Sequence, residues 1–169
     1  GSPILYTWNE AEGKKACWHS TSHVMAQVLE ETFPGIQLTL GPAIANGFYY
    51  DVDFGDQKIT EADFKAIESR ILEISKEKHE FKMRAVTKAE ALETYKDNVY
   101  KTELISNLED GTITFCDHAT FTDLCRGGHI PNTSIIKAVK IMSVAGAYWR
   151  GDEKNKQLTR VYGTSFPKQ

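Results

Sequence analysis

Two pairs of reactive side chains, each pair spaced four residues apart, constrain the fold of this chain most. His19 and His23 stand in the stretch His-Ser-Thr-Ser-His, and Cys125 and His129 stand in the stretch Cys-Arg-Gly-Gly-His. Positions i and i+4 lie on one face of a helix, so the two histidines can point to one place. Glycines before His129 let the backbone curl and turn both side chains inward. We therefore expect an early helix and a much later loop to meet at one site.

The four groups suit two kinds of chemistry. Three imidazoles and one thiol can form a tetrahedral zinc site. The same groups can instead hold one water molecule and move its protons, because imidazole titrates near neutral pH. A lone His-x-x-x-His spacing is a weak motif, but these four residues are half of the 5 histidines and 3 cysteines in the chain. This concentration favours a shared site, and the residues alone leave the choice between zinc and water open.

Length and composition indicate one globular domain that spans residues 1–169. With 41% hydrophobic and 25% charged residues, the chain has the ordinary composition of a soluble protein with a core. We expect no membrane segment, since no apolar run has the required length. Three cysteines without a framework spacing favour a reducing, cytoplasmic location. Gly1 and Ser2 have the character of an expression scar and are left out of the fold argument.

Charge is distributed unevenly along the chain. The net charge is −3, yet residues 131–169 carry seven basic and two acidic side chains. A basic surface of this kind can meet a phosphate backbone, or it can be a solvated face balanced by the acidic N-terminal third. An acidic chain argues against tight, autonomous binding of nucleic acid. We therefore expect weak binding that depends steeply on salt.

Hydrophobic periodicity predicts four helices separated by short strands. The helices are expected from between Asn9 and Lys15 to about Thr32, after the capping-box stretch 60–63, from Thr87, and from Val99 to Leu108. The strands are expected at 36–40, 48–54, 81–85, 112–115, 120–124, 139–144 and 158–162. Helices interspersed without βαβ regularity favour an α+β fold. Its mainly antiparallel sheet should pack against the long first helix, which carries the His19–His23 motif.

Several stretches together resemble the editing domain in the N-terminal part of the threonyl-tRNA synthetase family, which is related to the alanyl-tRNA synthetase editing domains. They are the stretches at 18–23, 40–51, 123–129, 146–152 and 158–164, which read WHSTSH, LGPAIANGFYYD, DLCRGGH, GAYWRGD and LTRVYGT. They occur in the order of the family and span nearly the whole chain. The last two resemble the threonyl type in particular.

The resemblance implies hydrolysis of mischarged seryl-tRNA(Thr) by water attack on the aminoacyl ester, which is post-transfer proofreading. It implies that the catalytic residues are His19, His23, Cys125, His129, Lys101 and Asp123, and that Asp123 and Tyr50 bind the substrate. It implies no required cofactor, although His19, His23, Cys125 and His129 have zinc-compatible chemistry. The implied partners are the serine-charged 3′ end of tRNA(Thr) and the remainder of the synthetase in cis, without a membrane.

Alternatives remain at several positions. Gly128 stands where the family usually has proline, which loosens the loop before His129. Lys101 can be a solvated helix residue, Asp123 a loop cap, and Tyr50 plain core. Cys17, Cys116, His79 and His118 are interpreted as structural, with His118 as the first substitute for a misassigned group. Trp18, Tyr148 and Trp149 are interpreted as core or cleft wall.

Two other functions remain open. One is a stand-alone enzyme of the alanyl type that edits a different mischarged tRNA, and the other is a non-catalytic tRNA-binding module that holds a structural zinc. We expect an excised domain, because the end of the chain resembles a domain junction and nothing resembles the ATP-binding motifs of a synthetase core.

Overall fold

The computed structural model describes residues 11–125 and 132–166 and confirms the expected α+β class. The helices are α1 (Ala11–Thr32), α2 (Glu61–Lys76), α3 (Lys88–Thr94) and α4 (Val99–Ser106), with short 3₁₀ turns at Thr133–Ile135 and Trp149–Gly151. The strands are β1 (Gln37–Leu38), β2 (Ala43–Ile44), β3 (Gly47–Asp53), β4 (Lys82–Ala85), β5 (Thr114–His118), β6 (Phe121–Leu124), β7 (Ala138–Tyr148) and β8 (Gln157–Phe166). In these ranges no helix is both long and apolar enough to cross a membrane.

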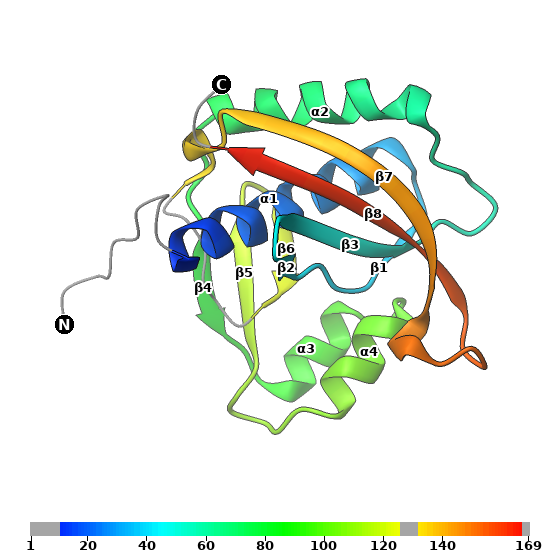
Figure 1. The fold of residues 1–169 in the computed structure, drawn as a ribbon. Coiled ribbons are helices and arrows are strands. Elements are labelled where there is room, and N and C mark those ends of the chain that lie inside the picture. Colours follow the sequence, from blue (N-terminus) through cyan, green and yellow to red (C-terminus); the bar gives the residue numbers. More distant parts are fainter. Residues whose placement is uncertain (1–10, 126–131, 167–169) are drawn as a thin grey trace.

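The strands of the described residues form two antiparallel sheets. The larger sheet has the order β1-β3-β8-β7, with β2 paired to β3, and the smaller has the order β4-β5-β6. The long hairpin of β7 and β8 curves across the molecule, and α1 passes behind β8 and β3 (Figure 1). Helices α3 and α4 pack against each other on the side of the molecule opposite α2. This arrangement brings β6 of the small sheet close to α1.

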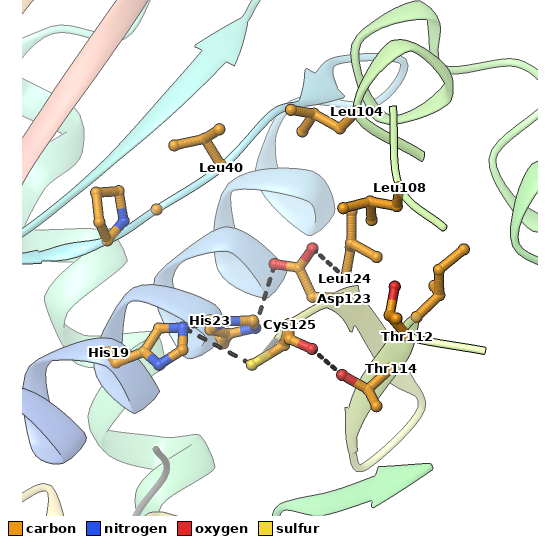
Figure 2. A pocket seen from close by; sticks show the side chains of 13 residues that line it. His19, His23, Leu40, Leu104, Leu108, Thr112, Thr114, Asp123, Leu124 and Cys125 are labelled. Carbon is orange, nitrogen blue, oxygen red and sulfur yellow. Dashed lines mark hydrogen bonds and ion pairs between the residues drawn. The ribbon is translucent and has the colours of Figure 1, made fainter. Parts of the chain in front are cut away.

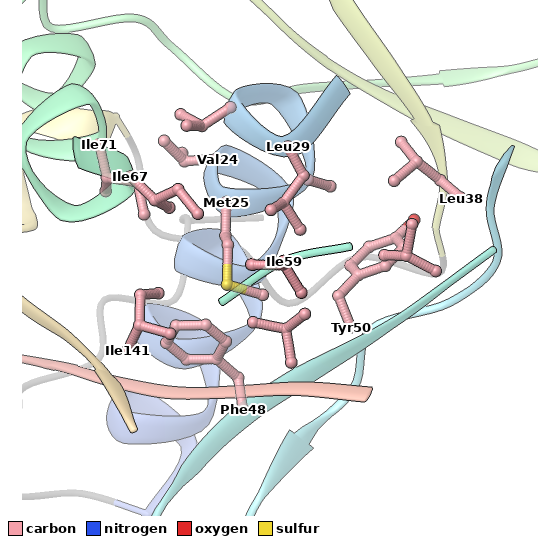
Figure 3. Close-up of a cluster of buried hydrophobic side chains, with 14 of the residues drawn as sticks. Val24, Met25, Leu29, Leu38, Phe48, Tyr50, Ile59, Ile67, Ile71 and Ile141 are labelled. Carbon is pink, nitrogen blue, oxygen red and sulfur yellow. The ribbon is translucent and has the colours of Figure 1, made fainter. Parts of the chain in front are cut away.

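The main core lies between α1, α2 and one face of the large sheet. Val24, Met25 and Leu29 of α1 contact the sheet residues Phe48 and Ile141 in one buried cluster (Figure 3). The isoleucines of α2 join the same cluster, at positions 67, 71 and 74. Their spacing of three and four residues is the apolar stripe expected of a half-buried helix. Burial of this stripe holds α1, and with it His19 and His23, against the sheet.

Local signals placed the helices more accurately than the strands. The expected capping box is present, since the Asp63 carboxylate accepts a hydrogen bond from the Thr60 N–H at 2.9 Å. The strand expected at 112–115 instead spans Thr114–His118, and the hydrogen bond from the Val86 N–H to the Ile113 carbonyl at 3.1 Å continues its pairing with β4 by one residue. Strand β7 is longer than expected, since much of it is exposed and a bulge after Ile141 interrupts its alternation.

Candidate active site

Helix α1 brings His19 and His23 together as their spacing predicts. Their Nε2 atoms lie 3.1 Å apart, and the two rings meet edge to face with centroids 4.8 Å apart. His23 is buried and His19 is half-buried. The Ser22 hydroxyl contacts the His19 carbonyl at 2.6 Å, which satisfies a backbone acceptor within the same turn. The helix thus presents two imidazoles side by side at its surface.

Strand β6 delivers the other half of the site. Asp123 lies in β6 and Cys125 directly follows it, where the Cys125 N–H still bonds to the Thr114 carbonyl at 3.1 Å. This extension of the β5–β6 pairing places the Cys125 Sγ 3.8 Å from the Nε2 of His19. The Asp123 carboxylate lies 3.2 Å from the Nδ1 of His23 (Figure 2). The structure therefore brings together three of the four expected groups, and His129 and Gly128 lie outside the described residues.

A buried polar cluster stands behind Asp123. Lys101 of α4 forms an ion pair with one carboxylate oxygen of Asp123, and the Tyr50 hydroxyl donates to the other at 2.7 Å. Lys101 also donates to the Tyr50 hydroxyl oxygen at 3.1 Å. Lys101 and Asp123 are each only 2% exposed and Tyr50 is fully buried. Such buried charges are tolerated only when they are paired and hydrogen-bonded.

This cluster keeps Asp123 ionised. Burial opposes ionisation, but the charges of Lys101 and His23 and the hydrogen bonds from Lys101 and Tyr50 lower the pKa of Asp123 below its ordinary value. Burial and the adjacent Asp123 raise the pKa of Tyr50 well above its usual range, so its phenol stays protonated. An ionised carboxylate only accepts hydrogen bonds. The position of this carboxylate 3.2 Å from Nδ1 of His23 favours the tautomer with its proton on Nδ1, which leaves Nε2 as an acceptor.

These groups open onto a cavity of about 590 Å³. Figure 2 shows its lining, which combines the polar residues His19, His23, Thr112, Thr114, Asp123 and Cys125 with Leu40, Gly41, Pro42, Leu104, Leu108, Ile113 and Leu124. Lys101 and Tyr50 do not line this cavity. Lys101 instead borders a second cavity of about 430 Å³, which Asp123 also lines. Both residues therefore act on the first cavity through Asp123.

One wall of the cavity is held in place by close backbone packing. The Ser22 hydroxyl contacts the Gly41 carbonyl at 2.9 Å and so ties this wall to α1. A Cβ atom on Gly41 would lie 2.2 Å from Cδ2 of the Tyr50 ring and 2.8 Å from the Tyr49 carbonyl oxygen. Only glycine fits such an approach without a shift of the wall. The side of the cavity nearest the histidines is therefore rigid.

The remaining cysteines and histidines divide into two groups. Cys17 contacts the Ser165 hydroxyl at 3.7 Å, and His118 contacts Gln27 at 2.8 Å. His79 contacts Glu77 at 2.7 Å on the surface. These contacts fit the structural role expected from the sequence. Cys116 differs, because its thiol is hydrogen-bonded to that of Cys125, which together with burial raises the pKa of Cys116.

Sequence reasoning missed some parts of the site. The contact of Cys116 with Cys125 could have been predicted from the paired strands expected at 112–115 and 120–124. In this antiparallel pair Cys116 lies opposite Asp123, so Cys125, two residues further on, stays close to β5. The apolar wall from α4 and the loop after it had no such signal, since the leucines at 104 and 108 fit an ordinary helical core stripe. For Trp18 the expected core position is observed, with its indole N–H donating to the Ser165 carbonyl at 2.9 Å.

His19, His23 and Cys125 are the described residues that can hold a metal ion, since one donor atom of each lies within 4.8 Å of the others. Two imidazoles and one thiolate suit zinc. The contact between Asp123 and the Nδ1 of His23 is also the one that typically orients a metal-bound histidine. The donor set therefore fits a zinc ion, and it equally fits a metal-free site that holds water between the same groups.

Two histidines, a thiol and an ionised carboxylate at one cavity of an α+β domain supply the groups that hydrolysis or metal binding requires. The family model described as "Threonyl and Alanyl tRNA synthetase second additional domain" matches residues 113–162. Over all 169 residues the chain is 88% identical to a threonine–tRNA ligase of Flavobacterium johnsoniae. It is 59% identical over 167 residues to the threonine–tRNA ligase of Parabacteroides distasonis, and 54% identical over 167 residues to that of Cytophaga hutchinsonii.

These matches include 98–100% of the chain, and the chain spans 26% of the length of each of these relatives. Residues 113–162 are thus similar to the second additional domain of threonyl and alanyl tRNA synthetases, and the whole chain is similar to about a quarter of the length of threonine–tRNA ligases.

Proposed function

We propose that this domain hydrolyses mischarged seryl-tRNA(Thr). The observation that carries the proposal is the convergence of His19, His23, Cys125 and Asp123 on one cavity wall. We further propose that the 169 residues act as one editing domain, joined in cis to the rest of a threonine–tRNA ligase in the cytoplasm. The supporting fact is the match of the whole chain to a quarter of such ligases.

A second site is needed because threonine and serine differ by one methyl group. Losing a methyl from a pocket supplies only about 1–3 kcal/mol, or roughly 10–200-fold discrimination, at the site that charges the tRNA. A separate cavity that admits serine and collides with the extra methyl removes the product that escaped. The rigid wall at Gly41 is suited to such a collision.

The reaction needs a water nucleophile, a stabilised oxyanion and a proton for the ribose oxygen that leaves. In the proposed mechanism, His23 accepts the proton of the attacking water on Nε2. The Asp123 carboxylate, 3.2 Å from Nδ1, stabilises the imidazolium that forms. The arrangement resembles the carboxylate–histidine pair of hydrolytic triads. His19, 3.1 Å away, is placed to hold the water or return the proton to the leaving oxygen.

Cys125 and Lys101 have supporting roles in this proposal. Cys125 orients His19 across 3.8 Å and is not the nucleophile. Lys101 does not line the reaction cavity, so its charge acts by keeping Asp123 ionised. Asp123 is the group that a bound serine amino group would meet. Tyr50, fully buried, contributes by holding the Asp123 carboxylate rather than by stacking on the terminal adenosine.

Deacylation of Ser-tRNA(Thr) by the purified chain, with and without a chelator, tests the proposal. We expect rapid release of serine that the chelator does not affect. No release above the background rate would contradict the proposal. Hydrolysis of Ser-tRNA(Ala) with no activity on Ser-tRNA(Thr) would assign the domain to the alanyl type.

A second candidate is a tRNA-binding module in which His19, His23 and Cys125 hold a structural zinc. The contact of Asp123 with the His23 Nδ1 favours it, because metal-bound histidines are commonly oriented in this way. A bound zinc would supply Lewis-acid or structural stabilisation. Tight stoichiometric zinc in the purified protein, loss of stability on chelation and no deacylation would support this candidate.

A further inference from the structure

One face of the large sheet carries aromatic and basic side chains that the proposed hydrolysis does not use. Because paired residues of neighbouring strands share a face, the register sets Tyr49 beside Tyr162 and Asp51 beside Arg160. Strand β7 adds Lys140 beside Thr164. The opposite face holds Phe48, Tyr50 and Val161 in the core against α1. Figure 1 looks onto the first face, with α1 behind β3 and β8.

The aromatic and basic groups on this face form an ordered array, which we call the tyrosine–arginine face (Tyr49, Tyr162, Arg160 and Lys140). The Arg160 guanidinium lies 4.0 Å from the centroid of the Tyr49 ring, and the Tyr49 and Tyr162 rings have centroids 5.9 Å apart. Asp51 accepts two hydrogen bonds from Arg160, at 2.7 and 2.9 Å, and so fixes the plane of the guanidinium. The side chain of Arg160 remains 28% exposed and Lys140 is exposed.

The sequence segment that forms β7, β8 and the connection between them is basic, in contrast to the chain as a whole. Residues 137–166 contain six basic and two acidic side chains, whereas the chain carries a net charge of −3. Planar rings and a guanidinium on an antiparallel sheet, with the exposed Lys140 on the next strand, match the chemistry by which proteins bind single-stranded nucleic acid. Bases stack on the rings, and the cations meet the phosphates.

Strand β3, which carries Tyr49, also lies next to the wall of the reaction cavity. The Tyr49 N–H donates to the Pro42 carbonyl at 3.3 Å, and Pro42 lines the cavity. A single-stranded RNA that lies across the face can therefore pass over the edge of the sheet at Pro42 and place its 3′ end near His19. We propose that this face binds the single-stranded 3′ segment of the tRNA and directs its charged end into the cavity. The inference rests on the proposed hydrolysis for the identity of the RNA.

Binding of a labelled single-stranded RNA that ends in CCA, followed by fluorescence anisotropy, tests the face directly. We expect Tyr162→Ala to weaken binding by about 5- to 150-fold, the range for loss of one stacking ring. Tyr162→Phe keeps the ring and loses only the hydroxyl contact to Arg160, so its affinity should stay near that of the wild type. An RNA duplex of equal length should bind more weakly than the single strand.

Lys140→Ala provides a test that does not depend on the packing of Tyr162, because Lys140 is exposed. Removing one phosphate contact should lower the slope of log Kd against log salt by about 0.7. Lys65→Ala, which removes an equally exposed cation from α2, should leave the slope unchanged. Unchanged binding in both Tyr162→Ala and Lys140→Ala, or a preference for the duplex, would overturn the inference.

A two-substrate assay separates this inference from the proposed function. We expect Tyr162→Ala to raise KM for Ser-tRNA(Thr) while hydrolysing 3′-seryl-adenosine, which has no strand to bind, at the wild-type rate. If wild-type protein hydrolyses neither ester, the proposed function is wrong and the binding assay alone decides about the face. If the variant hydrolyses both esters like the wild type, the tyrosine–arginine face does not bind the 3′ segment of the tRNA, and the proposed function stands.

Discussion

At the scale of single residues, the site is organised by one carboxylate. Asp123 contacts His23 at 3.2 Å, accepts from Tyr50 at 2.7 Å and pairs with Lys101. It thereby favours a proton on Nδ1 of His23, and the charge of Lys101 helps to lower its own pKa. The histidine pair and the buried cluster are thus parts of one electrostatic unit.

Replacement of His19 by alanine should lower the rate of Ser-tRNA(Thr) hydrolysis by about 10²–10⁴-fold, the usual contribution of a general acid or base. His129→Ala should have an effect of similar size if His129 shares the site as the sequence predicts. The melting temperature of each variant, measured by circular dichroism, should show that the fold persists. His79→Ala removes a surface histidine paired with Glu77 and should leave the rate unchanged. Near wild-type hydrolysis by folded His19→Ala would show that the assignment is wrong.

Removal of the Lys101 charge should change how stability depends on pH. In the wild type the pKa of Asp123 is lowered, so its stabilising contribution is present above the unfolded value of about 3.9 and is lost as the pH falls through the folded pKa. In Lys101→Met, Asp123 loses the positive charge of Lys101, while its burial still opposes ionisation. We expect a loss of about 3–5 kcal/mol at pH 7, part of which is recovered as the pH is lowered to about 5.

Urea unfolding at several pH values measures this effect. Lys96→Met is the matched control, because Lys96 forms an exposed pair with Glu93 and such pairs contribute about 0–1 kcal/mol. A parallel pH dependence of the wild type and Lys101→Met would show that Lys101 does not set the charge of Asp123.

At the scale of elements, α4 connects the cavity to the β7–β8 hairpin. Leu104 of α4 lines the cavity and also packs against the cluster of Tyr100, Trp149 and Leu158. The Tyr100 and Trp149 rings meet edge to face with centroids 5.1 Å apart, and the Trp149 indole N–H donates to Glu103. The distal end of the hairpin therefore supports the apolar wall of the cavity.

Trp149→Ala should destabilise the domain by about 3–5 kcal/mol, the usual cost of truncating a buried tryptophan. It should also reduce discrimination between seryl- and threonyl-tRNA, since Leu104 loses its support. Chemical denaturation and paired deacylation assays measure the two effects. Tyr148→Ala, at an adjacent and 43% exposed position, is the control and should change neither. Unaltered discrimination between the two charged tRNAs in Trp149→Ala would show that the hairpin does not support the cavity wall.

At the scale of the whole molecule, the cavity should act as a sieve for amino acid size. Seryl-tRNA should be hydrolysed faster than threonyl-tRNA, because the extra methyl must be forced against the wall of α1, Gly41 and Pro42. Overpacking by one methyl costs about 1–3 kcal/mol, which gives roughly 10–200-fold discrimination. A larger ratio would mean that the methyl also displaces the attacking water. Single-turnover deacylation of the two charged tRNAs measures the ratio, and equal rates would exclude a sieve.

Much of the fold was determined locally by the sequence. The helical period of α1 and α2, the start signal at Thr60 and the strand-like run at 48–54 predicted these elements, because each depends on residues a few positions apart. The same reasoning predicted that His19 and His23 share a face. Strand ends in β5 and β7 were less predictable, since they depend on which neighbouring carbonyls and N–H groups are available for pairing.

Only the tertiary structure decided how the site is completed. The contact between Tyr50 and Asp123 joins residues 73 positions apart, and that between His19 and Cys125 joins residues 106 positions apart. Such contacts depend on the packing of α1 against one sheet and on the register of another, which no short-range pattern encodes. For the same reason the sequence suggested Lys101 as a cavity residue, whereas packing of α4 places it behind Asp123. The sequence by itself determined the reactive groups, and three-dimensional packing determined which of them face the cavity and which act through a neighbour.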